Sequence, residues 1–503
     1  MSDKPNILHF FCDQLRFDVI GALNNPVIKT PNLDRLVREG TAFTSAYSAS
    51  PECVPARASM IFGQYPSSTK CYGNGSPMPF DDKETMMSAL GRAGYYCHGV
   101  GKCHFEPYDV GHELHGFDAR ERQEEITSHL ERDEYMQYLH GQGYDYVLDP
   151  HGIRGDMYYV PQPAQMPAKH HPTQWVGDRS VAFVESRKGQ DQPWYLFSSF
   201  IHPHPPFCPP NPWHKLYRDM DMPMPHMPLG YEDLLIYINR FQNRYKRRDR
   251  GFDLQLVRMM RAYYYACVSF IDYQVGRVLD ALEETGQLDN TMIFFMSDHG
   301  ELLGDFGSFG KRSYHDAPSR IPMLVRYPGK IEAGAQCDTP VGHVDVTRTI
   351  LDVAGAKIET HDLHGGNMID IAGGADADRV VFSQLYSGDN AIYTAVGKRW
   401  KYVYSAPDQR ELLFDRKQDP TETHDLANRT WNQKFASVRA QQEMRGRLIG
   451  MLKDTGETAA LDGDDWKEYP IKELPANPDA GMLYQDHPWA DQTIPGYSDE
   501  VDA

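Results

Sequence analysis

The chain has 503 residues, of which 41% are hydrophobic and 24% are charged, and this composition excludes the disordered, collagen-like and coiled-coil classes. The length fits one large α/β domain with an appendage, or two to three domains. Lys and Arg number 51 against 70 Asp and Glu, so the net charge is −19 and the surface field repels polyanions; we expect no nucleic-acid partner.

The sequence also bears on the cellular compartment. It has no apolar run of the roughly 18 to 20 residues that a membrane-spanning helix needs, and its first residues lack the basic region and cleavage-like site of a signal peptide. Eight cysteines are scattered without a CxxC pair, which indicates neither a disulfide framework nor a zinc ribbon. We therefore expect a cytoplasmic protein with mostly reduced thiols and no membrane partner.

Four short apolar runs along the chain each lead into polar residues. The runs cover 6–11, 95–100, 194–201 and 291–296, and the polar residues after them are Asp13-Gln14, Lys102 to His104, His202 to His204, and Asp298-His299. Runs of this length that are rich in aromatic and β-branched residues are typical of buried strands. Because ligands bind beyond the carboxyl ends of parallel strands, we expect these polar groups at one edge of a sheet.

Helical patterns lie between these runs, as βαβ alternation requires. Thr30 is the predicted N-cap of a helix that has Pro31 at its first position and ends at Gly40, and a longer helix is predicted over 254–285. The segment at about 205–250 is rich in Pro and Met and then basic, which indicates an insertion. It is interpreted as a solvated loop, with a lid or a subunit contact as the alternatives.

Alternating patterns at 391–396 and 400–404 predict a small antiparallel sheet. The expected fold class is α/β, with a large, mostly parallel sheet flanked by helices in a catalytic domain over 1–375. A smaller α+β subdomain with the antiparallel sheet follows over 376–455. An acidic tail rich in Pro and Tyr, over 456–503, is expected to be extended and to wrap over the body or a neighbouring subunit.

The segment Cys53-Val54-Pro55-Ala56-Arg57 is the most informative part of the chain. Cys53 and Arg57 are four residues apart and would share one face of a helical turn, and Pro55 is favoured in a first turn. A nucleophile at this place lies at the positive end of the helix dipole beside a guanidinium, where an anionic substrate is stabilised. Taken alone, the segment also fits a buried structural cysteine.

This segment resembles the C-x-P-x-R signature of the type I sulfatases of the alkaline phosphatase superfamily, in which the cysteine is converted to formylglycine. Gly94 to His104 is similar to the second signature of the family, although Cys97 stands where Ser or Thr is usual. Further motifs follow the family's order over about residues 4–430: Pro5 to Gln14, Thr30 to Asp34, Ser297 to Gly300, Gly310-Lys311 and Leu413 to Ala427. The resemblance implies an alkaline-phosphatase-like fold and a sulfuric ester hydrolase similar to arylsulfatases.

The resemblance also implies a metal site, in which the modified Cys53 completes a ligand set of Asp13, Gln14, Asp298 and His299. Carboxylate, amide and imidazole donors at strand ends suit a divalent cation by their own chemistry. Ca²⁺ is the first expectation, and the imidazole would also suit Mn²⁺. Many sulfatases carry Asp and Asn where this chain has Gln14 and His299, which leaves the identity of the metal open.

Beside Arg57, four side chains match the family's groups around the transferred anion and its leaving oxygen: Lys102, His104, His204 and Lys311. Sulfuryl transfer through a loose transition state leaves negative charge on these oxygens, and fixed cations stabilise it. His204 or Lys311 could donate a proton to the departing alcohol. Asn74 and His202 lie where related enzymes place substrate-contacting residues.

The implied mechanism begins with attack of one hydroxyl of the formylglycine diol on sulfur, which gives a covalent sulfo-enzyme. Collapse of the second hydroxyl to the aldehyde then releases sulfate. The expected partners are a small sulfate ester and a maturation enzyme that generates formylglycine from Cys53. A homo-oligomer, dimer or tetramer, is also expected.

Two other functions remain open from the sequence. Asp13-Gln14, Pro203 to Phe207 and Asp298 to Glu301 look like phosphonate monoester and phosphodiester hydrolases built on the same scaffold. Gly101 to His104, together with His115 to Phe117, instead looks like sulfatases of the choline-sulfatase type. A catalytically silent binding protein is the other class, but every position that the chemistry requires holds a competent residue. The sequence therefore favours hydrolysis of sulfate esters.

Overall fold

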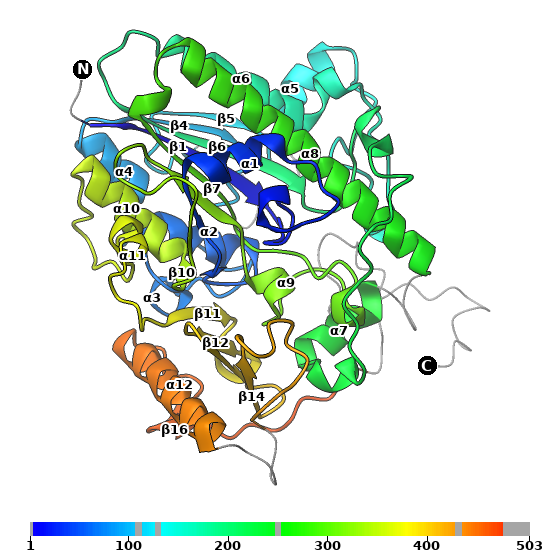
Figure 1. Cartoon of the computed structure of the whole chain (residues 1–503), viewed down its shortest axis with the longest axis vertical. Helices are drawn as coiled ribbons and strands as arrows, with labels where there is room; N and C mark the ends of the chain where they lie inside the picture. The colour runs from blue at the N-terminus through cyan, green and yellow to red at the C-terminus, as the bar shows by residue number, and fades with distance from the viewer. Residues whose placement is uncertain (1–3, 106–112, 126–131, 247–252, 428–434, 476–503) are drawn as a thin grey trace.

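The computed structural model describes residues 4–105, 113–125, 132–246, 253–427 and 435–475. Its centre is an eight-stranded sheet in the order β5-β4-β6-β1-β7-β8-β2-β9, and Figure 1 labels five of these strands, β5, β4, β6, β1 and β7. Only β8 runs antiparallel to its neighbours β7 and β2. The strands are β1 (Asn6–Asp13), β2 (Thr41–Phe43), β4 (Tyr96–Gly101), β5 (Ala119–Arg122), β6 (Trp194–Pro203), β7 (Thr291–Ser297), β8 (Met323–Arg326) and β9 (Ala335–Cys337). This sheet confirms the predicted fold class and all four predicted strands.

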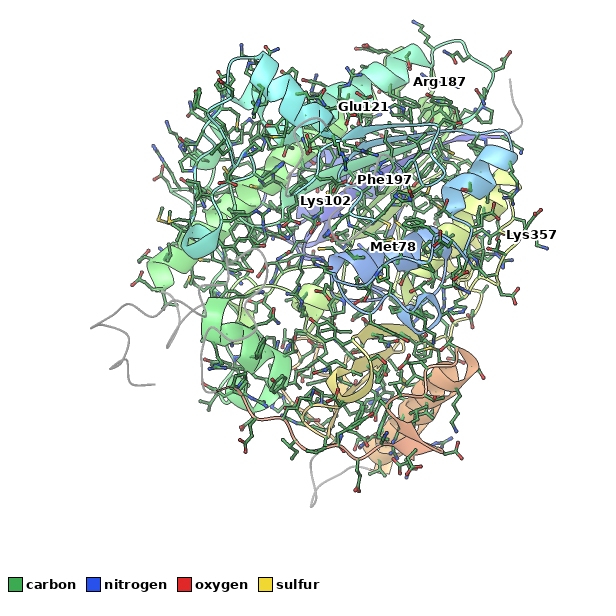
Figure 2. All side chains as sticks on the ribbon, turned by 180° about the vertical axis from the view of Figure 1, so that it is seen from behind. Met78, Lys102, Glu121, Arg187, Phe197 and Lys357 are labelled. Carbon is green, nitrogen blue, oxygen red and sulfur yellow. The ribbon has the colours of Figure 1, made fainter. Side chains whose placement is uncertain are left out.

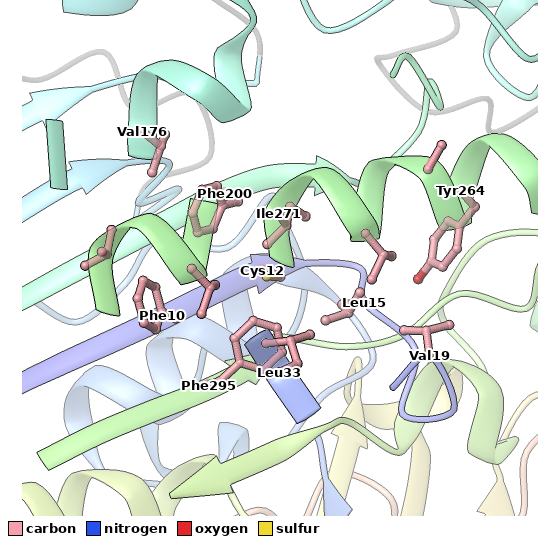
Figure 3. Close-up of a cluster of buried hydrophobic side chains, with 14 of the residues drawn as sticks. Phe10, Cys12, Leu15, Val19, Leu33, Val176, Phe200, Tyr264, Ile271 and Phe295 are labelled. Atoms are coloured by element: carbon pink, nitrogen blue, oxygen red, sulfur yellow. The ribbon is translucent and has the colours of Figure 1, made fainter. Parts of the chain in front are cut away.

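Helices cover both faces of the sheet, so every residue of β1, β6 and β7 is buried. The first face is packed by α1 (Pro31–Glu39), α6 (Pro172–Ser186) and α8 (Leu254–Glu284), and the second by α2 (Cys53–Phe62), α4 (Met86–Arg92) and α10 (His343–Ala354). Phe10 and Cys12 of β1 point to the first face, where Ile271 of α8 packs over them (Figure 3). Burial on both faces explains why these strands read as continuous apolar runs.

Shorter elements complete the part of the fold that precedes the antiparallel sheet. They are α3 (Pro66–Thr69), α5 (Glu134–Gly141), α9 (Asp316–Ser319), α11 (Met368–Ala372), and the paired short strands β3 (Ala46–Tyr47) and β10 (Val341–Gly342). Within the described residues, no helix has the length and apolar character needed to cross a membrane. All eight cysteines are buried and unlinked.

The carboxyl ends of four parallel strands meet at one edge of the sheet. Cys12 near the end of β1 pairs with Ser297 at the end of β7, and Gly101 at the end of β4 pairs with Ser199 in β6. The polar residues that follow these strands therefore leave the sheet on the same side, as the parallel arrangement predicts.

The N-terminus of α1 is capped by a residue from a distant helix. The Thr30 hydroxyl, predicted as the cap, instead donates to Asp34 Oδ1 at 3.2 Å. The backbone amides of Asn32 and Leu33 donate to Asp272 Oδ1 of α8 at 3.0 and 2.7 Å. Thr30 therefore occupies the predicted N-cap position, but its side chain does not cap the helix, and the Asp272 carboxylate satisfies the free amides instead.

Asp272→Ala is expected to lower the free energy of unfolding by about 1–3 kcal/mol. The substitution leaves the backbone amides of Asn32 and Leu33, and the side-chain amide of Asn32, without their acceptor. Asp280→Ala, on the exposed face of the same helix, is the control and should change stability by less than about 0.5 kcal/mol. Urea unfolding of both variants measures the difference. Equal midpoints for Asp272→Ala and the wild type would contradict this account of the cap.

Part of the predicted insertion is a packed element. Its helix α7 (Tyr237–Lys246) follows Leu234, Leu235 and Ile236. These residues are buried against the small antiparallel sheet described below and against the loop that contains Phe306. Gln242 Nε2 of α7 donates to the backbone carbonyl of Lys311 at 3.0 Å. Residues 234–246 are therefore not a solvated loop, and they support the loop that carries Lys311.

The second sheet is antiparallel and contains β11 (Val381–Leu385), β12 (Ile392–Val396), β13 (Trp400–Ser405) and β14 (Arg410–Asp415), with α12 (Phe435–Asp454) packed on it (Figure 1). The hairpin of β15 (Leu461–Asp462) and β16 (Asp465–Trp466) stacks Trp466 on Tyr404, with ring centroids 3.9 Å apart. The start of the predicted tail thus packs on this sheet, and 476–503 lie outside the described residues. The domain boundaries at 375 and 455 stay predictions.

Candidate active site

Cys53 is the first residue of α2, and three groups from distant parts of the chain surround its thiol. Lys311 Nζ donates to Cys53 Sγ at 2.7 Å, His299 Nε2 lies 3.3 Å away, and Asp13 Oδ1 lies 3.8 Å away. All four side chains are buried. The arrangement brings a thiol, an ammonium group, a carboxylate and an imidazole together beyond the ends of β1 and β7.

Ligand atoms of four buried residues, Asp13, Cys53, Asp298 and His299, all lie within 4.8 Å of one another. His299 Nδ1 donates to the carbonyl of Gly300 at 3.0 Å, which leaves Nε2 facing the cluster. Asp298 Oδ1 accepts hydrogen bonds from the backbone amides of Gln14 and His299, at 2.9 and 2.8 Å. Hydrogen bonds from the backbone therefore fix the orientation of the Asp298 carboxylate.

Gln14 supplies a further observation that fits a cation. Its Oε1 is buried and has no hydrogen-bond partner among the described residues, whereas its Nε2 donates to Glu301. A buried amide oxygen without a donor is costly, and a bound cation would satisfy it. Two carboxylates, an amide oxygen and an imidazole nitrogen are therefore a donor set that fits a divalent metal.

Arg57 lies beneath the two carboxylates. Its Nη2 is 3.1 Å from Asp13 Oδ2, and its Nε donates to Asp298 Oδ2 at 3.1 Å. Its Nη1 donates to the carbonyls of Lys102 and Cys103, and the guanidinium lies over the ring of Phe11. Burial acts to lower the pKa of Arg57, but Asp298 and Asp13 outweigh it and raise the pKa well above its ordinary value. Arg57 thus orients the carboxylates and balances their charge.

Lys102 lies inside the molecule at the end of β4 (Figure 2). Its Nζ is 2.6 Å from Asp13 Oδ2 and donates to Glu125 Oε2 at 2.5 Å. Burial acts to lower the pKa of Lys102, but the charges of Asp13 and Glu125 raise it above the usual range. Lys102 is therefore a fixed ammonium group beside the predicted ligands.

His204 and Lys311 form a pair next to Cys53. His204 Nδ1 faces the carbonyl of Pro205 at 2.7 Å, which leaves Nε2 to accept a hydrogen bond from Lys311 Nζ at 3.3 Å. Burial lowers the pKa of His204 well below its ordinary value. Burial also acts against the charge of Lys311, but Cys53 and Asp13 outweigh it and raise the pKa of Lys311. The pair can share a proton close to the nucleophile.

The other predicted site residues have no hydrogen bond to Cys53 within the described part of the chain. Asn74 Oδ1 accepts from the backbone amide of Val54 at 3.0 Å, and so lies at the start of α2. The imidazole of His104 has no hydrogen bond to Cys53 within the described residues, and burial, reinforced by Lys102, lowers its pKa to about 3. His202 packs on His171, with ring centroids 5.0 Å apart, outside the cluster around Cys53. The roles assigned to these residues stay predictions.

Two acidic residues of the site were not among the predicted site residues. Glu301 accepts from Gln14 Nε2 and from the backbone amides of Leu303 and Gly310, and its position three residues after Asp298 is a signal that could have identified it. Glu125 contacts Lys102 but follows β5, whose sequence Ala-Arg-Glu-Arg carries no strand pattern. No local signal in the sequence points to Glu125.

Comparison with known proteins places the chain in a family. Residues 5–356 match the sulfatase family, and residues 304–452 match the C-terminal region of N-sulphoglucosamine sulphohydrolase. The chain is 32% identical over 450 residues to a choline-sulfatase of Rhizobium meliloti (strain 1021), covering 84% of this chain and 82% of the relative. It is 29% identical over 449 residues to an arylsulfatase of Clostridium perfringens (strain 13 / Type A), covering 84% and 90%.

The fold is shared with the solved structure of the phosphonate monoester hydrolase of Agrobacterium radiobacter, with a TM-score of 0.77 and 23% identity over 91% of this chain and 98% of that chain. This likeness supports the fold alone, whereas the family match and the sequence relatives support the class of enzyme. The chain therefore belongs to the sulfatase family and is a sulfuric ester hydrolase.

Proposed function

We propose that the protein hydrolyses sulfate monoesters to an alcohol and inorganic sulfate, with the hydrated aldehyde of a formylglycine made from Cys53 as the nucleophile. The supporting observation is the position of Cys53 Sγ, which is 2.7 Å from Lys311 Nζ and belongs to the cluster with Asp13, Asp298 and His299. In the modified protein, a hydroxyl oxygen replaces this sulfur. A thiol cannot release sulfate by forming an aldehyde, so conversion of Cys53 by a maturation enzyme is part of the proposal.

The reaction has two covalent steps. One hydroxyl of the diol loses its proton and attacks sulfur, the bond from sulfur to the alcohol oxygen breaks, and the alcohol departs with a proton from the His204–Lys311 pair. The second hydroxyl then loses its proton and its oxygen forms the aldehyde double bond, while the carbon–oxygen bond to the sulfate breaks. Water adds to the aldehyde and restores the diol.

Asp13, Gln14, Asp298 and His299 are the residues that would hold the metal of the proposed site, together with the modified Cys53. When bound, a divalent cation lowers the pKa of the attacking hydroxyl and offsets charge on the transferred group. We propose Ca²⁺, because oxygen atoms predominate in the donor set, with Mn²⁺ as the alternative that the imidazole of His299 favours.

Removal of the metal with a chelator is expected to abolish hydrolysis of an aryl sulfate and to lower the thermal midpoint, because an ion that binds only the folded state stabilises it. Elemental analysis should find about one ion per chain, as one site of this donor set requires. Addition of Ca²⁺ should restore both properties. Restoration by Mn²⁺ alone would assign that metal, and a chelated protein with unchanged activity and midpoint would contradict the site.

The second candidate is hydrolysis of phosphonate monoesters and phosphodiesters, which the Gln14 and His299 pair favours. A singly charged phosphodiester resembles a sulfate monoester in charge and shape, so both can enter one site. The test compares kcat/KM on an aryl sulfate, a phosphodiester and a phosphonate monoester with the same phenol leaving group. We expect the sulfate to react fastest, and preference for either phosphorus compound would reverse the assignment.

A further inference from the structure

Six side chains form a closed ring of contacts that includes Cys53. From Cys53 Sγ the ring passes to Lys311 Nζ at 2.7 Å, to His204 Nε2 at 3.3 Å and to Glu125 Oε1 at 3.4 Å. From Glu125 Oε2 it continues to Lys102 Nζ at 2.5 Å and to Asp13 Oδ2 at 2.6 Å, and Asp13 Oδ1 is 3.8 Å from Cys53 Sγ. Of the six members, Glu125 alone has no role in the proposed chemistry.

The fold explains how Glu125 comes to be in this ring. Strand β5 lies at the edge of the sheet and pairs in parallel with β4, with Arg122 beside Gly101. Lys102 directly follows β4, and Glu125 follows β5 three residues after its end. The two side chains therefore leave neighbouring strands at the same edge and meet there, and Glu125 is 8% exposed.

The charges around Glu125 require an anion at this point. Its Oε1 lies 2.9 Å from Arg154 Nη1 on the side away from Lys102, so Glu125 contacts two cations and one imidazole. Buried cations without a counter-ion are costly. Burial acts to raise the pKa of Glu125, but the charges of Lys102 and Arg154 outweigh it and hold the pKa well below the usual range. Glu125 is therefore an ionised carboxylate with both oxygens engaged.

We propose that Glu125 is a positioning residue for departure of the leaving group: its carboxylate holds Lys102 Nζ, and it accepts a hydrogen bond from His204 Nε2 whenever the proton shared with Lys311 lies on His204. His204 in turn fixes Lys311, so loss of the Glu125 charge would disturb the pair that supplies the proton to the departing oxygen. Glu125 and Cys53 are not neighbours in the ring, so Glu125 acts on the site through the residues between them. This inference rests on the proposed sulfatase function and adds a residue to it.

The test is Glu125→Gln, which keeps the size of the side chain and removes its charge. The variant is assayed on aryl sulfates whose phenols span a wide range of pKa, and on an alkyl sulfate. For the poorest leaving groups we expect kcat to fall roughly 10- to 100-fold, because these alcohols need a proton as they depart. For the best leaving group we expect a loss below about threefold, and a KM within about threefold throughout, because such a group departs without a proton and the donors to sulfate remain.

Glu121→Gln is the matched control. Glu121 lies on β5 beside Val100 and pairs with His98 and Arg179, so its loss removes one carboxylate from the same strand outside the ring. We expect the wild-type dependence on leaving group for this variant. Glu125→Asp keeps the charge and should recover part of the rate for poor leaving groups. If Glu125→Gln does not fold, Glu125→Asp is compared with the wild type in the same assay.

Failure of the proposed sulfatase function and failure of the positioning role of Glu125 give different results. A wild-type protein that carries formylglycine but hydrolyses no sulfate ester would overturn the proposed function. An active wild type, together with a Glu125→Gln variant that loses nothing or loses the same factor on every leaving group, would overturn the positioning role. Mass spectrometry of residue 53 and the thermal midpoint are measured on each variant, so that failed maturation or unfolding is not counted as a loss of positioning.

Discussion

Replacement of Cys53 by alanine is expected to lower kcat/KM for an aryl sulfate by roughly four orders of magnitude or more, the scale on which loss of a catalytic nucleophile acts. Cys53 Sγ is the atom that Lys311 and His299 approach within 2.7 and 3.3 Å, and alanine has nothing at this point that can attack sulfur. Alanine keeps the Cβ and is favourable in a helix, so α2 should remain intact.

The control for this variant is Cys337→Ala, which removes a thiol from β9, a strand that contributes no residue to the site. It should keep nearly all of the activity. Steady-state kinetics on both variants, with thermal midpoints to confirm folding, measure the difference. A Cys53→Ala protein with more than about one hundredth of the wild-type kcat/KM would show that residue 53 is not the nucleophile.

Arg57→Met is expected to have the largest effect on stability, a loss of about 3–5 kcal/mol in the metal-free protein. The substitution keeps an unbranched apolar chain but leaves Asp13 and Asp298 buried without the guanidinium that lies 3.1 Å from each. The carbonyls of Lys102 and Cys103 also lose their donor. Activity should fall by roughly a thousandfold, because catalytic geometry depends on ligands that are held in place.

Arg348→Met is the matched control for Arg57→Met, because its guanidinium pairs with Asp352 one turn along α10 at an exposed position. Such pairs contribute about 0.3–0.5 kcal/mol, so this variant should unfold close to the wild type. Urea unfolding of the metal-free proteins gives both values. If Arg57→Met were as stable as Arg348→Met, the two buried carboxylates would not depend on Arg57 for their charge balance.

Much of the fold could be predicted because strands buried on both faces are continuous apolar runs in the sequence. The run at 291–296 becomes β7 with one additional residue at its end, and the polar residues that follow it lie where parallel strands place them. Strand β5 could not be predicted, because an edge strand with the sequence Ala-Arg-Glu-Arg has no alternation and only one small apolar residue.

Contacts between distant segments account for what the sequence did not show. Asp272, which caps α1, is 240 residues from Asn32 in the chain, whereas the local candidate Thr30 is used elsewhere. The ligands of the predicted metal site could be predicted because they lie in sequence motifs of the family. Glu125 lies in no such motif and comes to the site because β5 pairs with β4. Residues 234–236 looked like part of an insertion because the sheet that buries them comes much later in the chain.

The central claim is that residue 53 acts as formylglycine, and mass spectrometry of the peptide that contains it is the most direct test. In active protein from a host with the maturation enzyme, the peptide should show the mass of an aldehyde in place of the thiol. The specific activity of separate preparations should rise in proportion to the converted fraction. Full sulfatase activity in a preparation whose residue 53 is entirely cysteine would contradict the account.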